Sequence, residues 1–312
     1  MAIYTKIQAS DLNKIVAPYK IEVVDFTPIE GGNANSNYHI HAKSGEYMMT
    51  IAEEKSFHEV QKLTTLLQWL GKHHFLTSPV HTTITGEMVT QYTGKPVFVK
   101  KWIYGTVHEN FTTDELAQIG ISMAQLHQIP APDYLPKYHP YGQQVFSSVI
   151  GKGIDTEYEK WLKERLHFLK KHIPEDLPRG LVHGDIFFDN VLFENNKIKA
   201  IIDFEEACNY YLIFDLGMGI LGLCRTGGKI DLNKARALIK GYEQIRSLGV
   251  TERDSLQLFI EYAAIATSYW RFWKYNIHSP IPDLRNKHWK MVQVAKEVQI
   301  MDKKHFLSIV FE

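Results

Sequence analysis

Three oxygen-bearing side chains stand out because they follow one another within a short and otherwise apolar part of the sequence. Asp185 and Asn190 lie in the loop 183–190, and Asp203 ends the apolar run 198–202. A carboxylate can orient an attacking hydroxyl and accept its proton, while an amide oxygen and a second carboxylate are ligands that Mg²⁺ prefers. These residue types indicate transfer of a phosphoryl group onto a hydroxyl, a reaction that depends on positioning and on neutralising phosphate charge.

The spacing is that of a kinase catalytic loop, in which an Asp stands five residues before a metal-binding Asn and another Asp follows a hairpin. The sequence Glu-Asn-Asn-Lys at 194–197 separates two apolar runs and predicts that hairpin. An Asp beside a turn is usually solvated or caps a helix, and the interval between Asp185 and Asn190 alone is weak evidence. The whole string, which ends in Ile-Ile-Asp-Phe-Glu at 201–205, is much more specific.

Each residue of this string has an expected role. We expect Asp185 to be the catalytic carboxylate, with Asn190 and Asp203 as ligands of the Mg²⁺ that accompanies ATP. His183 is the other catalytic candidate: it is expected to bond the backbone around the loop, with a general-base role as the alternative. Asp215 is expected to brace the loop rather than touch substrate. The scattered histidines and the two cysteines show no zinc-like spacing.

The first hundred residues read mostly as strands and turns. Apolar and polar residues alternate over 38–42, which is the period of a half-buried strand, and 47–52 form the returning strand of a hairpin. Two more strands are expected at 88–92 and 97–103, with a turn between them. A glycine-rich stretch precedes the first hairpin.

One helix interrupts these strands, and helices dominate the rest of the chain. An apolar stripe over 60–70 predicts a helix with Gly71 at its C-cap, and Thr112 with Glu115 forms the capping box of the next helix. Further helices are expected at 155–172, at 232–247 and from Thr251 onward.

The order of elements predicts an α+β chain with two lobes, a small β-rich N-lobe and a larger, mainly helical C-lobe. The expected hinge is 100–105. We therefore divide the chain into 1–103, an N-terminal nucleotide-binding lobe, and 104–312, a C-terminal lobe for catalysis and acceptor binding. Clefts between such lobes are common ligand sites.

The composition excludes several classes of protein. Hydrophobic residues make up 45% and charged residues 22%, which is ordinary for a globular protein, and 35 basic residues balance 35 acidic ones. We therefore expect no nucleic-acid partner. Two cysteines argue against a disulfide framework, and we recognise neither a signal peptide nor a membrane span. We expect a cytoplasmic protein, a monomer or homodimer, that does not bind membranes.

The string HGDIFFDNVLF…IIDFEEA…FDLG resembles the signature of the aminoglycoside phosphotransferase and choline kinase superfamily, small-molecule kinases with a protein-kinase-like fold. The stretch GISMAQLH at 120–127 looks like the helix before that family's catalytic loop. Within the superfamily the chain is most similar to type II homoserine kinases, in its opening residues, in GGNANSNY at 31–38 and in KARALIKGYEQIRSL at 234–248. The resemblance spans most of the chain and makes Asp185 a better base than His183.

The resemblance also assigns the glycine-rich segment to phosphate binding. Gly31 and Gly32 are expected to let the backbone approach phosphates closely, with Ser36 and Asn37 donating to phosphate oxygens. Taken alone, the two glycines are more often just a turn. The superfamily commonly places a phosphate-binding Lys where this chain has Thr50, and the resemblance to homoserine kinases implies that this subgroup also lacks the Lys.

Two departures put the acceptor in question rather than the reaction. Gly184 stands where homoserine kinases often have Ala, and Glu205 where they usually have Tyr. Lys43 and Lys55 are both candidates for the missing positive charge. Trp270 and its aromatic neighbours are expected to be core, with a cage for a quaternary ammonium as the alternative.

The leading hypothesis is thus an ATP-dependent kinase of a small hydroxyl compound, with homoserine or a related amino alcohol as acceptor. A kinase for an aminoglycoside, choline or an amino sugar is the alternative enzyme. A protein kinase is disfavoured because the chain has neither Asp-Phe-Gly after the hairpin nor Ala-Pro-Glu beyond it. A nucleotide-binding pseudokinase is the non-enzymatic alternative, supported by Thr50 and opposed by the retained Asp185, Asn190 and Asp203.

Overall fold

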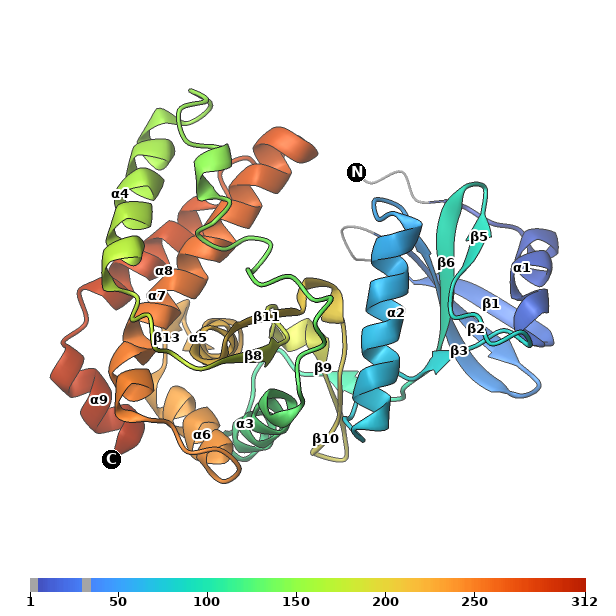
Figure 1. Cartoon of the computed structure of the whole chain (residues 1–312), viewed down its shortest axis with the longest axis horizontal. Helices are drawn as coiled ribbons and strands as arrows, with labels where there is room; N and C mark the ends of the chain where they lie inside the picture. Colours follow the sequence, from blue (N-terminus) through green and yellow to red (C-terminus); the bar gives the residue numbers. More distant parts are fainter. Residues whose placement is uncertain (1–4, 30–34) are drawn as a thin grey trace. The chain divides into compact units, whose positions relative to one another are not determined.

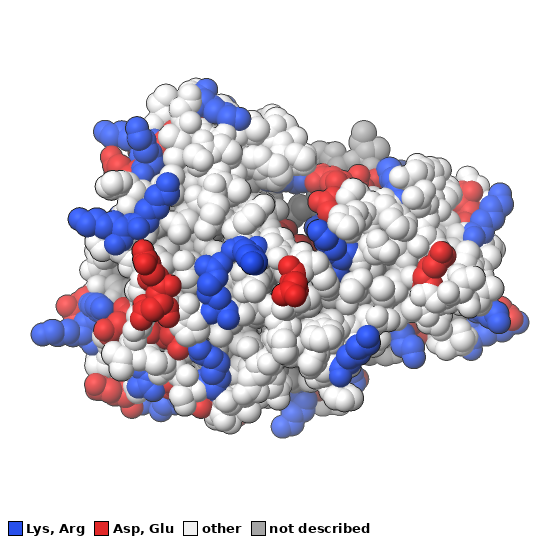
Figure 2. Space-filling model, in the orientation of Figure 1, with Lys and Arg blue, Asp and Glu red and all other residues white. Residues whose placement is uncertain are grey.

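The computed structural model describes residues 5–29 and 35–312. The chain divides into two compact units (Figure 1), which are Met1–Gly105 with Lys199–Ile202, and Thr106–Ile198 with Asp203–Glu312. Within the described residues, no helix is both long and apolar enough to cross a membrane. On the face shown in Figure 2, basic and acidic side chains lie among one another, in keeping with the balanced charge of the sequence.

The first unit is built on an antiparallel sheet in the order β1-β2-β3-β6-β4, with β5 also paired to β6. Its strands are β1 (Val23–Ile29), β2 (Asn35–Ala42), β3 (Gly45–Ala52), β4 (Val80–His81), β5 (Thr90–Tyr92) and β6 (Lys95–Lys101). Its helices are α1 (Ala9–Val16), the short η1 (Ala17–Tyr19) and α2 (Phe57–Lys72).

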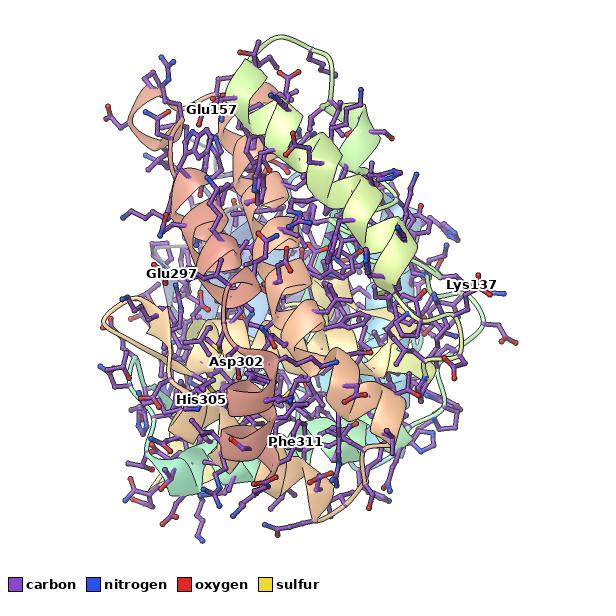
Figure 3. The ribbon with its side chains drawn as sticks, turned by 90° about the vertical axis from the view of Figure 1, so that its left-hand side faces the viewer. Lys137, Glu157, Glu297, Asp302, His305 and Phe311 are labelled. Atoms are coloured by element: carbon purple, nitrogen blue, oxygen red, sulfur yellow. The ribbon has the colours of Figure 1, made fainter. Side chains whose placement is uncertain are left out.

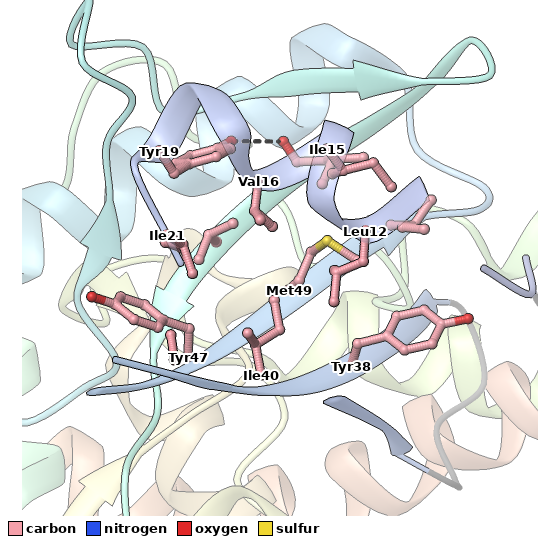
Figure 4. Close-up of a cluster of buried hydrophobic side chains, with 13 residues drawn as sticks. Leu12, Ile15, Val16, Tyr19, Ile21, Tyr38, Ile40, Tyr47 and Met49 are labelled. Carbon is pink, nitrogen blue, oxygen red and sulfur yellow. Dashed lines mark hydrogen bonds between the residues drawn. The ribbon is translucent and has the colours of Figure 1, made fainter. Parts of the chain in front are cut away.

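Alternation along β2 explains how this sheet acquires a core. Tyr38 and Ile40 are buried on one face, where they pack with Met49 of β3 against Leu12 and Val16 of α1 (Figure 4). The predicted hairpin is thereby confirmed, because β2 and β3 pair over their whole length.

The predicted end of the first helix is wrong. Gly71 lies inside α2, which continues to Lys72 and has His73 as its C-cap. The N–H of His73 still bonds the carbonyl oxygens of Trp69 and Leu70, so the last turn closes two residues later than expected. The left-handed backbone that a C-terminal glycine often supplies is taken by His74, with φ 57°.

The second unit is mainly helical, and two of its helices meet at glycines. A Cβ on Gly120 would lie 2.0 Å from the carbonyl oxygen of Leu238, and one on Gly241 would lie 2.0 Å from that of Ala117. Only glycine lets the two helix backbones approach so closely. The helices are α3 (Thr113–Gln128), α4 (Thr156–His172), α5 (Leu212–Leu223), α6 (Leu232–Glu243), α7 (Val250–Trp273), α8 (Trp289–Gln299) and α9 (Lys303–Phe311).

Most predicted helices appear near their expected positions. Thr112 and Glu115 form the expected capping box of α3, and Asp155 caps α4 through the N–H of Tyr158. The helix predicted at 232–247 ends earlier, at Glu243. Figure 3 shows α9 with Asp302, His305 and Phe311 labelled; the Asp302 carboxylate accepts the N–H of His305 at 2.7 Å, which fixes the start of this last helix.

Short strands lie outside the sheet of the first unit; most belong to the second unit, while residues 199–201 of β10 belong to the first. β8 (Arg179–Val182) pairs antiparallel with β11 (Cys208–Tyr211), and a three-stranded sheet has the order β10-β9-β7. In that sheet β7 is Thr106–Val107, β9 is Val191–Glu194 and β10 is Lys197–Ile201. Asn195 and Asn196, both with positive φ, form the two-residue turn of the predicted hairpin. A further pair joins β12 (Arg225–Thr226) to β13 (Lys229–Ile230).

Candidate active site

The loop between β8 and β9 is held by one carboxylate of α5. Asp215 accepts the backbone N–H of His183 at 2.9 Å on Oδ2 and that of Gly184 at 2.8 Å on Oδ1. Its side chain is fully buried and lies on the first turn of α5, where the helix dipole favours a negative charge. The prediction that Asp215 braces the loop is confirmed.

A buried hydrogen-bonded chain extends this brace across two more helices. His127, at the end of α3, places Nε2 3.1 Å from Asp215 Oδ2 and Nδ1 2.7 Å from the Tyr242 hydroxyl of α6. Burial alone would raise the pKa of Asp215, but the hydrogen bond and charge of His127, the charge of His183 and the N–H of His183 lower it. Asp215 therefore stays ionised, which keeps both loop N–H groups bonded to it.

Gly184, one of the two residues that Asp215 anchors, takes a backbone conformation that favours glycine. Gly184 has φ +84°, and a Cβ there would lie 2.8 Å from the carbonyl oxygen of Glu206 and 3.0 Å from the His139 ring. His139 is buried and uses Nε2 to bond the Gly184 carbonyl oxygen at 3.0 Å, while Nδ1 accepts the N–H of Tyr141. Burial lowers the pKa of His139 to about 4, so the ring remains neutral and its Nε2–H donates to the loop.

Asp185 and Asn190 are brought together as the spacing predicts. The Nδ2 of Asn190 donates to the carbonyl oxygen of Asp185 at 2.8 Å and lies 3.4 Å from the Asp185 carboxylate. Both bonds use the amide nitrogen, so the amide oxygen of Asn190 is left for another partner. An oxygen presented in this way is a suitable ligand for a hard divalent cation.

Four carboxylates gather around this point. Burial raises the pKa of Asp185 well above its usual range, and the charges of Glu206, Asp203 and Asp189 raise it further. Asp203 is exposed and has a left-handed backbone with φ 68°, at the residue where β10 has ended and a short turn begins. Such a concentration of negative charge is favourable when a cation binds to it.

His183 lies behind the loop rather than at its surface. It is fully buried, its Nδ1 accepts the backbone N–H of Asp185 at 3.2 Å, and its ring centre lies 4.6 Å from that of Phe204. These contacts agree with the expectation that it bonds the backbone around the loop.

A group of residues that the sequence did not single out lies beside Asp185. The Tyr141 hydroxyl donates to Glu206 Oε1 at 3.2 Å and is also hydrogen-bonded to the Trp270 side chain. Burial raises the pKa of Tyr141, and the charges of Glu206 and Asp185 raise it further. Trp270 and Trp273 are half-buried, with ring centres 6.1 and 6.3 Å from that of Tyr141. The prediction that this aromatic stretch is core therefore holds for buried Tyr269 but not for the two tryptophans.

Sequence signals for these residues were weak. The sequence drew attention to Glu205 as a departure from a family pattern, but not to Glu206, which directly follows it. Tyr141 and His139 stand in a loop without periodicity, so nothing local distinguishes them from ordinary loop residues.

In the first unit, two of the predicted phosphate-binding residues can be followed. Ser36 donates its hydroxyl to the Glu53 carboxylate, and Asn37 Oδ1 accepts the Thr50 hydroxyl at 2.8 Å. The amide nitrogen of Asn37 is not used by that bond. The hydroxyl proton of Ser36 is donated to Glu53 in this structure. Donation from Ser36 to a phosphate oxygen stays a prediction. Gly31 and Gly32 lie outside the described residues.

Glu53 is the centre of a network that sequence reasoning missed. Burial alone would raise its pKa, but hydrogen bonds from Lys95, Ser36 and Thr5 lower it to about 2. Of the two candidates for a replacement lysine, Lys43 pairs with Glu22 at 2.6 Å, and both side chains are exposed.

Comparison with known proteins identifies the family. Residues 25–248 match the model of the "Phosphotransferase enzyme family". The chain is 27% identical over 296 residues to a protein named homoserine kinase from Paramagnetospirillum magneticum, covering 90% of each chain. Among solved structures it resembles an amicoumacin kinase in complex with AMP-PNP, Ca²⁺ and Ami, with TM-score 0.73, 14% identity, and 96% of this chain and 97% of that one covered.

A microcompartment-associated aminopropanol kinase gives a TM-score of 0.68 at 14% identity, with 98% of this chain and 99% of that one covered. These likenesses establish a protein-kinase-like fold, with an antiparallel sheet in the first unit and a mainly helical second unit. The matched segment contains the whole loop from His183 to Asn190, its anchor Asp215, and His127, which bonds Asp215. The chain belongs to the phosphotransferase enzyme family.

Proposed function

We propose that this phosphotransferase transfers the γ-phosphoryl group of ATP to the hydroxyl of a small amino alcohol, with homoserine as first choice. The observation that carries the proposal is the pairing of Asp185 with Asn190 on a loop anchored by buried Asp215. Asp185 orients the acceptor hydroxyl and accepts its proton late in the reaction, because little charge develops on the nucleophile in a loose transition state.

The donor set fits Mg²⁺. Asn190 Oδ1 and the Asp203 carboxylate would hold the ion together with phosphate oxygens, since Mg²⁺ is usually bound by one or two carboxylates plus substrate phosphates. When bound, the ion neutralises charge on the phosphates. Among the described residues, no group of three His, Cys, Asp or Glu side chains is placed to hold a metal ion by itself.

The surroundings of Asp185 favour an acceptor with a positive charge. Glu206 provides a carboxylate, and the rings of Tyr141 and Trp270 provide faces that attract cations. An ammonium group beside Glu206 would offset the crowding of carboxylates around Asp185. Curated relatives named homoserine kinase make homoserine the first candidate among amino alcohols.

The proposal is tested by ADP release from Mg·ATP with a panel of acceptors: L-homoserine, 3-aminopropan-1-ol, choline, kanamycin and glucose. We expect stimulation by L-homoserine above that by choline or kanamycin. Greater turnover of choline or an aminoglycoside would move the acceptor to the alternative class while preserving the kinase. Mg·ATP binding without stimulation by any alcohol would instead indicate a pseudokinase.

A further inference from the structure

Two arginines in the second unit lie close together, and among the described residues neither has an acidic partner. Arg225 directly follows the C-cap of α5, and Arg271 lies in the last turn of α7. Burial lowers the pKa of Arg271, and the positive charge of Arg225 lowers it further. Lys287 adds a third cation, since burial and the charge of Arg271 both lower its pKa.

The hydrogen-bonding groups of this pair are poorly satisfied. Arg225 Nε is buried and bonds nothing in the part of the chain that the structure describes. The side-chain bond of Arg271 is a long one, 3.5 Å from Nη1 to the Lys287 carbonyl oxygen. Burying positive charge without a counter-charge is unfavourable, so the pair is expected to bind an anion.

Other arginines of the same region have an acidic partner, although Arg253 Nε is, like Arg225 Nε, buried without a hydrogen bond in the described structure. Arg253, at the opposite end of α7, lies 2.8 Å from Glu243, and Arg246 lies 2.9 Å from Glu252. Of these four arginines of the described residues, Arg246 and Arg253 have an acidic partner, whereas Arg225 and Arg271 have none.

The pair is tied to the catalytic loop through α5. A Cβ on Gly222 would lie 2.3 Å from the carbonyl oxygen of Ile186, so the last turn of α5 packs directly on the residue after Asp185. Arg225 comes three residues later. Thr267 of α7 contacts Met218 of α5, and Arg271 is one turn further along that face of α7.

The pair is also connected to the residues beside Asp185. Trp270, whose side chain bonds Tyr141, directly precedes Arg271 in α7. The carboxylate and aromatic rings beside Asp185 and the two guanidinium groups thus come from elements that contact one another. Opposite charges of this kind match the ammonium and carboxylate of an amino acid.

We propose that Arg225 and Arg271 bind the carboxylate of the acceptor, so that this enzyme selects a hydroxy amino acid over amino alcohols that lack a carboxylate. The inference rests on the proposed function, since it places the acceptor hydroxyl at Asp185. A guanidinium presents paired N–H donors that match a carboxylate in a bidentate geometry, which a lysine does not provide.

The first arm of the test measures binding without catalysis. L-2-aminobutyrate has the ammonium and carboxylate of homoserine without the hydroxyl, and propylamine lacks the carboxylate as well. In calorimetry with the Mg·AMP-PNP-saturated protein, R225Q and R271Q should weaken L-2-aminobutyrate about 10–100-fold, as expected for loss of charge-assisted hydrogen bonds. Propylamine affinity should be the same in all variants. R253Q, on the same helix, should bind both compounds as the wild type does.

The second arm measures specificity in turnover. The ratio of kcat/KM for L-homoserine to that for 3-aminopropan-1-ol should fall about 10–100-fold in R225Q and R271Q, with KM for ATP unchanged. R225K and R271K should recover only part of the loss. Equal losses for both acceptors, or a raised KM for ATP alone, would show that the pair serves the fold or the nucleotide phosphates and would overturn the inference.

The two arms separate this inference from the proposed function. Arginine-dependent binding of L-2-aminobutyrate without turnover of L-homoserine would support the carboxylate site and overturn the proposed reaction. Turnover of L-homoserine with binding of L-2-aminobutyrate unaffected by R225Q and R271Q would support the reaction and overturn the carboxylate site.

Discussion

The side chain of Asp185 is positioned by the groups that fix the backbone on either side of it. Asp215 holds the N–H groups of His183 and Gly184, His139 holds the Gly184 carbonyl, and Asn190 holds the carbonyl of Asp185 itself. Each of these contacts restrains the carboxylate without blocking it. In the proposed reaction, the rigid main chain serves catalysis by holding the Asp185 carboxylate in place.

Gly184 offers a direct test of that rigidity. G184A should lower kcat and destabilise the protein, because Ala at φ +84° is strained and its Cβ would collide with the Glu206 carbonyl and the His139 ring. G151A is the matched control, since Gly151 has φ +85° with nothing within 4 Å of an added Cβ. Strain alone costs about 1–3 kcal/mol, so urea unfolding should show a greater loss for G184A.

Steady-state kinetics supply the second comparison for this pair of variants. We expect kcat to fall only in G184A. Equal stability and equal kcat in G184A and G151A would show that the close packing behind the loop has no role.

At this scale the sequence predicted the residues whose spacing is part of a motif and missed the isolated ones. Asp185 and Asn190 meet because they are five positions apart in a tight loop, and Asp215 braces that loop at His183 and Gly184 as expected. His139 and Glu206 reach the loop from segments whose positions depend on tertiary packing. Local spacing carries no information about such contacts.

Between elements, a buried chain links three helices to the loop. Tyr242 of α6 bonds His127 of α3, which bonds Asp215 of α5, and the close crossing of α3 and α6 at Gly120 and Gly241 brings the first two together. The packing of these helices is therefore transmitted to the catalytic backbone through hydrogen bonds rather than through apolar contact alone.

Y242F removes the hydroxyl that holds His127. We expect a stability loss of about 1–2 kcal/mol, typical of a buried hydrogen bond, together with a several-fold lower kcat and unchanged KM for ATP. Y269F is the control, because the Tyr269 hydroxyl bonds Ser148 at 2.8 Å, away from the loop. Thermal unfolding and steady-state kinetics of both variants give the comparison. A kcat loss in Y269F as large as that in Y242F would refute a specific role for the hydrogen bonds that join Tyr242, His127 and Asp215.

Element boundaries show where local signals suffice. The capping box of Thr112 and Glu115 defined the start of α3 correctly, since both partners are local in sequence. The end of α2 was placed two residues too early, with Gly71 as C-cap, because a glycine permits a helix to stop but does not require it. The helix continues because the N–H of His73 still bonds backbone carbonyl oxygens of its last turn.

For the whole molecule, one buried acid makes stability depend on pH. Glu261 of α7 is 4% exposed, and burial raises its pKa to about 7, although Arg165 lies 3.2 Å away. In the unfolded chain the pKa of this carboxyl is 4.5. As pH rises from 4.5 to 7, Glu261 ionises in the unfolded chain but stays protonated in the folded protein. The free energy of unfolding therefore falls over this window, by up to about 3 kcal/mol.

E261Q keeps the shape of this side chain and cannot ionise. Its urea midpoint should rise relative to the wild type as pH increases from about 4.5 to about 8, with little difference at the lowest pH. E157Q serves as control, because Glu157 is exposed on α4 (Figure 3), and its difference from the wild type should stay small. A constant offset between E261Q and wild type across this range would contradict the account.

The fold class was also within reach of the sequence. The order of hairpin, helix, strands and later helices predicted a β-rich unit followed by a helical one, and the solved relatives share that fold. The residues proposed to contact the acceptor could not be found in this way, because Tyr141, Glu206, Arg225 and Arg271 come from four separate segments of the second unit. Only the fold relates such segments to one another.

The most direct measurement is ³¹P NMR of the reaction of Mg·ATP with L-homoserine, run with wild type, D185N and H183N. We predict a new phosphomonoester resonance with the wild type, and a rate about 10²–10⁴-fold lower with D185N at nearly unchanged affinity for Mg·ATP, because Asn cannot accept the proton. H183N should lose stability and a smaller part of the rate. Near-wild-type product formation by D185N, with none by H183N, would contradict the central claim and make the histidine the base.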